Sequence, residues 1–359
     1  MSKTIIIIGA GLAGLSAALQ AAENGCNVKL VSSLPSERAQ SVMAEGGINA
    51  ALNTKDENDS PEEHFTDTIK AACGLADPNA VWGMTQAAPE LVHWLLKLGV
   101  KFNMSGYDDV DLRNFGGQKK KRTAFAQSDT GKQIMTAMID AVRRKEASGM
   151  VERFSHHSFL TLRLCGNICC GCVIRDEYSQ ETVELPGDAV IVATGGMHGL
   201  FGNTTGSLSN TGEVTAELFR LGVPLANGEM IQYHPTTVKC GGKRMLISEA
   251  ARGEGGRLFA MKDGKQWYFM EEKYPELGNL MPRDITAREI WKVSHESEVF
   301  LDMTEISEEI ISNKLSGLAD DCMTYLHKDI RKEPVSVLPG IHYLSLIHIS
   351  EPTRPISIS

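Results

Sequence analysis

Thr4-Ile5-Ile6-Ile7-Ile8-Gly9-Ala10-Gly11-Leu12-Ala13-Gly14 is the stretch that decides the fold of this chain. The β-branched run before Gly9 predicts a strand, residues 12–24 predict a helix that Gly25 ends, and residues 28–31 predict the next strand. Two strands joined by a crossover helix form a βαβ unit, and such units build parallel sheets. The sequence therefore predicts an α/β fold.

The glycines of this stretch have the G-x-G-x-x-G spacing of a nucleotide-binding turn. Gly9 makes the tight turn, Gly11 lets the backbone approach a pyrophosphate, and Gly14 lets the helix pack close to the strand. The second strand ends in Ser32-Ser33, where NAD-binding proteins often carry an acidic ribose ligand. A serine hydroxyl can also bond a ribose, so this departure weakens the prediction of NAD more than that of FAD.

Length and composition limit the classes of protein that remain. A chain of 359 residues predicts about two domains, and its 42% hydrophobic content excludes a disordered or collagen-like protein. The net charge of −9 argues against a nucleic acid partner. Apolar residues 5–19 are too short for a membrane span, and the nucleotide turn uses their glycines, which disfavours a signal peptide.

The eight cysteines predict reduced thiols in a cytoplasmic protein. Cys169, Cys170 and Cys172 lie in an alternating apolar stretch without a second cysteine pair at metal spacing. This pattern favours a buried strand over a metal site.

Further elements follow along the chain. Helical periodicity returns at residues 61–73, 80–98 and 131–146, and strand-like alternation covers residues 154–174 and 183–192. From residue 232 the sequence becomes rich in glycine turns and scattered aromatic residues. We expect a first domain over residues 1–231, an inserted second domain over 232–339, and a return to the first domain at 340–359.

Several segments resemble the flavoprotein subunit of succinate dehydrogenase and fumarate reductase, in that family's order. They are Ala44-Glu45-Gly46-Gly47, Phe115-Gly116-Gly117, Arg122-Thr123-Ala124, Asp129-Thr130-Gly131, Ala193-Thr194-Gly195-Gly196, Gln232-Tyr233-His234-Pro235-Thr236, Ser248-Glu249-Ala250-Ala251-Arg252-Gly253-Glu254-Gly255-Gly256, Pro282-Arg283-Asp284 and His342-Tyr343. The resemblance implies a glutathione-reductase-like FAD-binding domain of Rossmann type, interrupted by an α+β capping domain. It also implies interconversion of fumarate and succinate with FAD as the cofactor.

The resemblance implies a set of residues around the cofactor, on the turn and on later motifs. They are Gly9, Gly11, Ala13, Gly14, Ser32, Ser33, Gln40, Ser41, Ala44, Gly46, Gly47, Thr194, Gly195 and Glu213. Gln40 stands where many members carry the histidine that links FAD covalently. Because an amide cannot form that bond, we expect non-covalent FAD, a lower flavin potential and a bias toward fumarate reduction.

The resemblance also implies a dicarboxylate site. His234, Ser248 and His342 match substrate-binding positions, and Arg283 matches the family's proton donor. Glu249 and Arg252 match the acid and arginine that supply Arg283 with protons, and their i, i+3 spacing places them on one face of a helix. The alternative, a structural ion-pair network, remains open.

The end of the chain departs from the family. After His342-Tyr343, residues 344–359 have no family counterpart and resemble translated adaptor sequence on a truncated reading frame; a divergent tail is the alternative. We therefore expect the 359 residues alone to bind FAD weakly and to lack turnover.

L-aspartate oxidase is the competing enzyme, because it shares the fold, several motifs and non-covalent FAD. The stretch 263–280 resembles the succinate and fumarate branch more closely. That branch implies an iron–sulfur subunit and a membrane cytochrome b as partners, and a cytoplasmic protein at the inner face of the membrane. A non-catalytic fragment is the remaining alternative.

Overall fold

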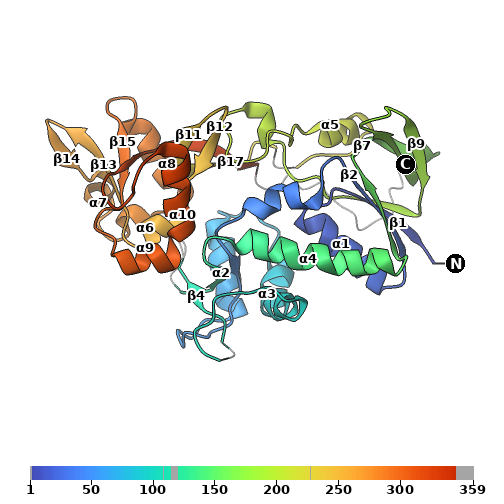
Figure 1. Ribbon diagram of the computed structural model, residues 1–359, viewed down its shortest axis with the longest axis horizontal. Coiled ribbons are helices and arrows are strands. Elements are labelled where there is room, and N and C mark those ends of the chain that lie inside the picture. Colours follow the sequence, from blue (N-terminus) through green and yellow to red (C-terminus); the bar gives the residue numbers. More distant parts are fainter. Residues whose placement is uncertain (1, 108, 115–119, 227, 345–359) are drawn as a thin grey trace. The chain divides into compact units, whose positions relative to one another are not determined.

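The computed structural model describes residues 2–107, 109–114, 120–226 and 228–344. The chain divides into two compact units (Figure 1). Unit 1 comprises residues 1–43, 134–232 and 341–359, and unit 2 comprises residues 44–133 and 233–340. The expected Phe115-Gly116-Gly117 motif and the tail beyond residue 344 lie outside the described residues.

Unit 1 contains a four-stranded parallel sheet in the order β10–β1–β2–β6. Its strands are β1 (Thr4–Ile8), β2 (Asn27–Ser32), β6 (Val151–Ser155) and β10 (Ala189–Val192). Helix α1 (Leu12–Glu23) is the crossover between β1 and β2, and Gly25 follows it with a φ of +77°. The predicted βαβ unit is therefore confirmed. Ile6, Ile7 and Ile8 of β1 are buried because a central parallel strand is covered on both faces.

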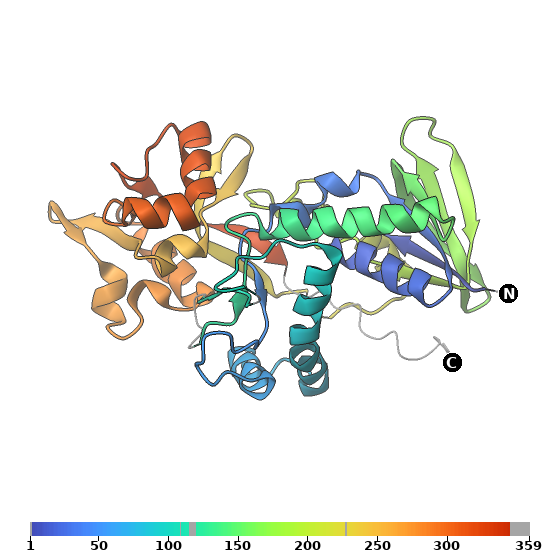
Figure 2. The ribbon, with the colours of Figure 1, turned by 60° about the horizontal axis from the view of Figure 1, so that its bottom comes forward.

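An antiparallel sheet, β7–β8–β9, extends from the parallel sheet as a long ribbon (Figure 2). Its strands are β7 (His157–Cys165), β8 (Ile168–Asp176) and β9 (Thr182–Pro186). The single strand predicted over residues 183–192 is wrong, because the chain breaks at Gly187-Asp188 into β9 and β10. There the Asp188 carboxylate accepts a hydrogen bond of 2.7 Å from the Thr4 N–H.

The cysteines of β7 and β8 correct one expectation. Cys165 and Cys170 form a disulfide, so the prediction that all eight cysteines are reduced thiols is wrong. The tight turn between the two strands brings their Cα atoms to 6.1 Å, a separation that a disulfide can bridge. The predicted strand is confirmed, since Cys169, Cys170 and Cys172 all belong to β8.

The remaining elements of unit 1 connect these sheets. They are the short 3₁₀ helices η1 (Ser36–Arg38), η2 (Gln40–Met43) and η3 (His198–Phe201), helix α5 (Glu213–Arg220), and most of helix α4 (Thr130–Ala147), which begins within unit 2. A core cluster joins the two sheets of the unit: Ile6, Ile8, Val31, Cys172, Ile174 and Leu185.

The first part of unit 2 holds two helices that lie side by side (Figure 2). Ser60 caps α2 (Pro61–Ala71) by accepting from the Glu63 N–H at 3.2 Å, and Asp77 caps α3 (Pro78–Leu98) in the same way at Asn79. A proline occupies the first position of each helix, where its missing N–H costs nothing. Two-residue strands form a small sheet beside them: β3 (Ile48–Asn49), β5 (Thr123–Ala124) and β4 (Leu112–Arg113).

Arg122 precedes β5 and is almost fully buried. Its guanidinium lies 2.8 Å from the Asp59 carboxylate and 3.0 Å from that of Asp67, so its charge is neutralised within unit 2. The described contacts of Arg122 are therefore those of a structural ion pair.

The second part of unit 2 packs two sheets against short helices. One sheet has the order β12–β11–β17 and the other β14–β13–β15–β16, and β11 begins and β17 ends within unit 1. The bounds are β11 (Ile231–Cys240), β12 (Lys243–Leu246), α6 (Glu249–Gly253), β13 (Arg257–Lys262), β14 (Lys265–Trp267), α7 (Phe269–Lys273), η4 (Gly278–Leu280), α8 (Arg283–Val293), β15 (Val299–Asp302), α9 (Glu308–Lys314), α10 (Ser316–Asp321), the π-helical turn η5 (Cys322–Leu326), β16 (Val335–Ser336) and β17 (Leu338–Leu344). Buried apolar residues from β11, β13, β15 and β16 and from helices α6 to α10 form a continuous core.

The divisions expected at residues 231/232 and 339/340 lie within one residue of two points where the chain passes between the units. Residues 44–133 group with residues 233–340 and not with the nucleotide turn. The capping role of residues 232–339 stays a prediction. Within the described ranges, no helix is long and apolar enough to cross a membrane.

Candidate functional site

The glycine turn of unit 1 is built so tightly that side chains are excluded from it. A Cβ on Gly14 would lie 1.8 Å from the Gly9 carbonyl oxygen, and a Cβ on Gly9 would lie 2.3 Å from that of Ala193. Gly9 also has a φ of +109°, which L side chains rarely adopt. By contrast, a Cβ on Gly11 would approach nothing closer than the Ser41 Oγ, at 3.4 Å. Gly9 and Gly14 are therefore required by the fold, whereas the fold leaves room for a Cβ at Gly11, whose approach to a pyrophosphate stays a prediction.

The turn fits the dinucleotide that the sequence predicts. Helix α1 begins after Gly11 without a side-chain cap, and the Leu12 N–H donates to the Ser41 Oγ at 3.2 Å. Such a helix N-terminus presents N–H groups and a positive dipole to a phosphate. At the end of β2 the Ser32 hydroxyl is buried, with no hydrogen-bond partner among the described residues. A ribose hydroxyl would supply that partner.

The other predicted cofactor residues divide between the two units. Unit 1 holds exposed Ala13 on α1, exposed Ser33 after β2, half-buried Gln40 at the start of η2, Thr194 and Gly195 after β10, and exposed Glu213 at the start of α5. Unit 2 holds Ala44, Gly46 and Gly47. Ala44 and Gly46 use their carbonyl oxygens to accept from the Gly131 N–H and the Arg113 guanidinium.

A buried chain of three charges forms the centre of unit 2. The Arg283 guanidinium donates to one Glu249 carboxylate oxygen at 2.8 and 3.0 Å, and Arg252 donates to the other at 2.9 Å. The Arg252 and Glu249 side chains are 1% and 5% exposed, whereas that of Arg283 is 30% exposed. The predicted proximity of these residues is therefore confirmed, and Arg283 is the accessible end of the chain of charges.

The two arginines control the charge of Glu249. Burial alone would raise the pKa of this carboxyl, but Arg283 and Arg252 outweigh it and hold the pKa below the ordinary value. Burial lowers the pKa of Arg252, and the positive charge of Arg283 lowers it further. Glu249 is consequently ionised at neutral pH, between two cations.

The predicted carboxylate ligands occupy both units. His234 lies in β11 and is buried, and its Nδ1 is 3.1 Å from the Thr236 carbonyl oxygen, which fixes the ring. Ser248 is the N-cap of α6, directly before Glu249. His342 belongs to unit 1, and its Nδ1 lies 2.6 Å from the Thr205 hydroxyl. Within unit 2, therefore, β11 carries His234 and Ser248 caps α6. The chain of charges lies on α6 and α8.

Sequence reasoning missed Glu45 as a titrating group. Burial raises its pKa to about 7, with a further contribution from Asp321, while the Ser248 hydroxyl and Arg113 act against the rise. Burial also lowers the pKa of Arg113 to about 10. An acidic residue inside the glycine-rich Ala44–Gly47 motif was the available signal. Nothing in the sequence around Arg113 pointed to its contact with this loop.

The model of the FAD binding domain family matches residues 4–346. The chain belongs to the FAD-binding-domain family. The succinate dehydrogenase flavoprotein subunit of Bacillus subtilis is 43% identical over 350 residues, which cover 95% of this chain and 60% of that protein. An L-aspartate oxidase from a Nostoc species is 33% identical, over 94% of this chain and 58% of that protein. A quinol fumarate reductase structure from Escherichia coli has a TM-score of 0.87 at 28% identity, covering 96% of this chain and 61% of that one.

This FAD-binding-domain chain therefore spans about 60% of the length of the relatives it matches. The predicted resemblance to succinate dehydrogenase and fumarate reductase flavoproteins is confirmed, as is the predicted α/β flavoprotein fold. The glycine turn between β1 and α1 lies within the matched residues.

Proposed function

We propose that the protein containing this chain interconverts fumarate and succinate and favours fumarate reduction. The observation that carries the proposal is the buried Arg283–Glu249–Arg252 chain, which couples an accessible guanidinium to a buried carboxylate. Adding hydrogen across a double bond needs a hydride at one carbon and a proton at the other. When bound, FAD supplies the hydride chemistry, and the residues of unit 2 supply the proton and hold the substrate.

In this proposal Arg283 delivers the proton to a substrate carbon. A guanidinium holds its proton strongly, so it donates only as negative charge develops on that carbon. Glu249 then passes a proton from Arg252 to Arg283, and the lowered pKa of Arg252 favours this transfer. His234 and Ser248 hold one substrate carboxylate. Cations and hydrogen-bond donors around a dianion stabilise the charge that builds up in the transition state.

We also propose that FAD is held without a covalent bond. The turn formed by Gly9, Gly11 and Gly14 holds the pyrophosphate, and Ser32 holds a ribose. Gln40 occupies the linking position and has no nucleophilic atom suited to that bond. Denaturing the purified holoprotein in acid and filtering it tests the proposal: free flavin passes the filter, whereas a covalent adduct stays with the protein.

The proposed partner subunits are those that the resemblance to succinate dehydrogenase and fumarate reductase implies. We propose an iron–sulfur subunit that exchanges electrons with the flavoprotein and a membrane cytochrome b that binds the pair at the inner face of the membrane. Affinity purification of the full-length protein from its own cells tests this, with iron–sulfur and haem absorption as the readout.

The competing function is L-aspartate oxidation, which the Nostoc relative keeps open. The deciding experiment measures fumarate reduction by a reduced dye and oxidation of L-aspartate with the same full-length protein. Turnover of fumarate alone supports the proposal. Turnover of L-aspartate with none of fumarate assigns the site to the competing function, and turnover of neither points to a protein without catalytic activity.

A further inference from the structure

The end of the β7–β8 ribbon in unit 1 carries four cysteines within eight residues: Cys165, Cys169, Cys170 and Cys172. Cys165 and Cys170 form the disulfide, and Cys169 and Cys172 keep their thiols. The fumarate chemistry proposed above uses none of these sulfur atoms. The ribbon therefore holds a cluster of redox-active side chains whose role is unassigned.

The backbone of the ribbon closes the hairpin without help from the disulfide. Gly166 and Asn167 form a two-residue turn, Gly166 has a φ of +63°, and Cys165 pairs with Ile168 directly across the turn. The disulfide joins residues only five positions apart, and a bond across so short a loop removes little entropy from the unfolded chain. Its contribution to the stability of the hairpin is therefore small.

Cys170 is the extra residue of a β-bulge. On β8, Cys169 and Gly171 pair with consecutive residues of β7, and Cys170 between them is skipped by the register. A bulge turns a side chain out of the regular alternation of a strand. The bulge therefore brings the Cys170 sulfur to Cys165, with the two Cα atoms 6.1 Å apart.

The two halves of the disulfide differ in access. Cys165 is exposed, whereas Cys170 is half-buried. The Cys170 carbonyl oxygen accepts from the Gly187 N–H at 3.2 Å, and Gly171 packs so closely against β9 that a Cβ would lie 2.0 Å from the Leu185 carbonyl oxygen. An incoming thiolate therefore reaches the Cys165 sulfur first, and Cys170 is the sulfur that leaves the bond and stays in place.

From this geometry we propose that the Cys165–Cys170 pair is a reversible thiol-modification site whose co-substrate is a low-molecular-weight monothiol of the glutathione class. The monothiol loses its proton and attacks the Cys165 Sγ. The bond between Cys165 and Cys170 breaks, and the Cys170 thiolate takes up the released proton. A second monothiol then attacks the first, which leaves Cys165 as a thiol and releases the oxidised monothiol dimer. Two monothiols are oxidised for each protein disulfide reduced.

The other two cysteines of the cluster are spectators in this exchange. Burial raises the pKa of the Cys172 thiol to about 12, so this thiol stays protonated and unreactive at neutral pH. Cys169 is half-buried, and its thiol donates to the Gly171 carbonyl oxygen at 3.6 Å. Cys165 is therefore the accessible sulfur of the cluster, and the exchange begins there.

A redox titration of the full-length holoprotein tests this inference. The protein is equilibrated with glutathione at set ratios of reduced to oxidised form, quenched in acid and alkylated without reduction. Tandem mass spectrometry of tryptic peptide 164–175, which contains all four cysteines, then reads the state of each sulfur. We expect the disulfide to convert to two thiols through an intermediate with glutathione on Cys165, and to form again when oxidised glutathione is restored. Flavin content should not change.

Single substitutions locate the attacked sulfur. With oxidised glutathione, Cys170→Ser should retain glutathione on Cys165, because the sulfur that reverses the step is gone. Cys165→Ser should take up glutathione on Cys170 about tenfold more slowly or less readily still, because that sulfur is half-buried. Cys73→Ser is the matched control: it removes an exposed cysteine outside the ribbon and should titrate like the parent protein.

A disulfide that persists in the folded protein under excess reduced glutathione would overturn the inference, because the bond would then be structural. Two thiols that persist under excess oxidised glutathione would overturn it as well, as would equal rates of modification in Cys165→Ser and Cys170→Ser. The titration of the parent protein needs no substitution, so a misfolded variant does not decide the outcome. Fumarate turnover is not measured in this test, and the inference stands or falls separately from the proposed function.

Discussion

The glycine turn of unit 1 depends on the absence of side chains, whereas the chain of charges in unit 2 depends on ionised side chains. The turn depends on missing side chains: its backbone segments approach so closely that a single methyl group at Gly14 would overlap a carbonyl oxygen. The chain of charges depends on side chains whose ionisation states are set by their neighbours. A larger side chain in the glycine turn should overlap the backbone and destabilise the fold. A substitution in the chain of charges should lower turnover and leave the fold intact.

Gly14→Ala should give the largest effect, because the new Cβ would lie 1.8 Å from the Gly9 oxygen. We expect a loss of more than about 4 kcal/mol in the free energy of unfolding, together with the loss of bound flavin. Gly11→Ala is the matched control: its Cβ has room, so the protein should fold and lose only flavin affinity. Urea unfolding and flavin absorbance measure both. A Gly14→Ala protein with normal flavin content would show that the turn can relax.

Arg283→Lys should abolish chemistry while leaving the fold and the flavin in place. Lysine keeps the charge near Glu249 but loses the planar guanidinium that makes two hydrogen bonds to it. We expect kcat for fumarate reduction to fall about 10²–10⁴-fold, as for a lost general acid. Arg288→Lys is the control, on the same helix but exposed. Near-normal turnover of Arg283→Lys would make the chain of charges a structural network.

Glu45 should make the stability of the protein depend on pH. Its pKa is raised from 4.5 to about 7, so the folded state keeps a proton that the unfolded state loses in this window. The free energy of unfolding should therefore fall as the pH rises from about 4.5 to about 7, by up to about 3 kcal/mol. Glu45→Gln removes this contribution, and exposed Glu309→Gln should not. Parallel pH dependence in the Glu45→Gln and parent proteins would place the titration elsewhere.

Gly25→Ala should give the smallest effect. This glycine has a φ of +77°, yet a Cβ there would meet nothing within 4 Å. The only cost is the left-handed backbone, and we expect a loss of about 1 kcal/mol with unchanged flavin binding. Comparison with Gly14→Ala then separates backbone conformation from steric contact within one βαβ unit. If Gly25→Ala lowered the free energy of unfolding as much as Gly14→Ala, backbone conformation would cost as much as steric contact in this βαβ unit.

The sequence alone predicted the local features of this protein well. The strand before Gly9, helix α1 and the turn between them follow from patterns within about thirty residues, because propensity and periodicity act over such distances. The family motifs also identified Glu249, Arg252 and Arg283 as neighbours. The break between β9 and β10 was missed because the strand residues on both sides of Pro186-Gly187-Asp188 predicted a single strand, although a proline and a glycine there signal a turn.

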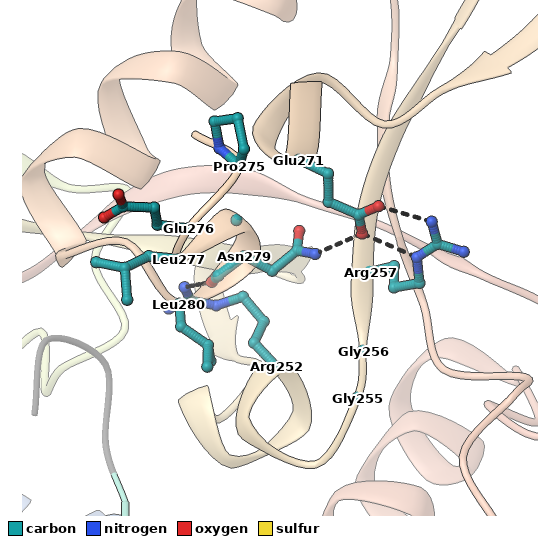
Figure 3. Close-up of a pocket in the computed structure, with 11 residues that line it drawn as sticks. Arg252, Gly255, Gly256, Arg257, Glu271, Pro275, Glu276, Leu277, Asn279 and Leu280 are labelled. Atoms are coloured by element: carbon teal, nitrogen blue, oxygen red, sulfur yellow. Dashed lines mark hydrogen bonds and ion pairs between the residues drawn. The ribbon is translucent and has the colours of Figure 1, made fainter. Parts of the chain in front are cut away.

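Only the tertiary structure decided the electrostatics. Glu45 receives its raised pKa from burial and from Asp321, far along the chain, and Asn279 connects α6, β13 and α7 through its hydrogen bonds (Figure 3). Burial and charge proximity depend on which distant segments pack together, and no local pattern records that packing. The sequence therefore determined the local βαβ unit and predicted which groups carry the chemistry, and the fold determined the pKa of Glu45 and of Glu249.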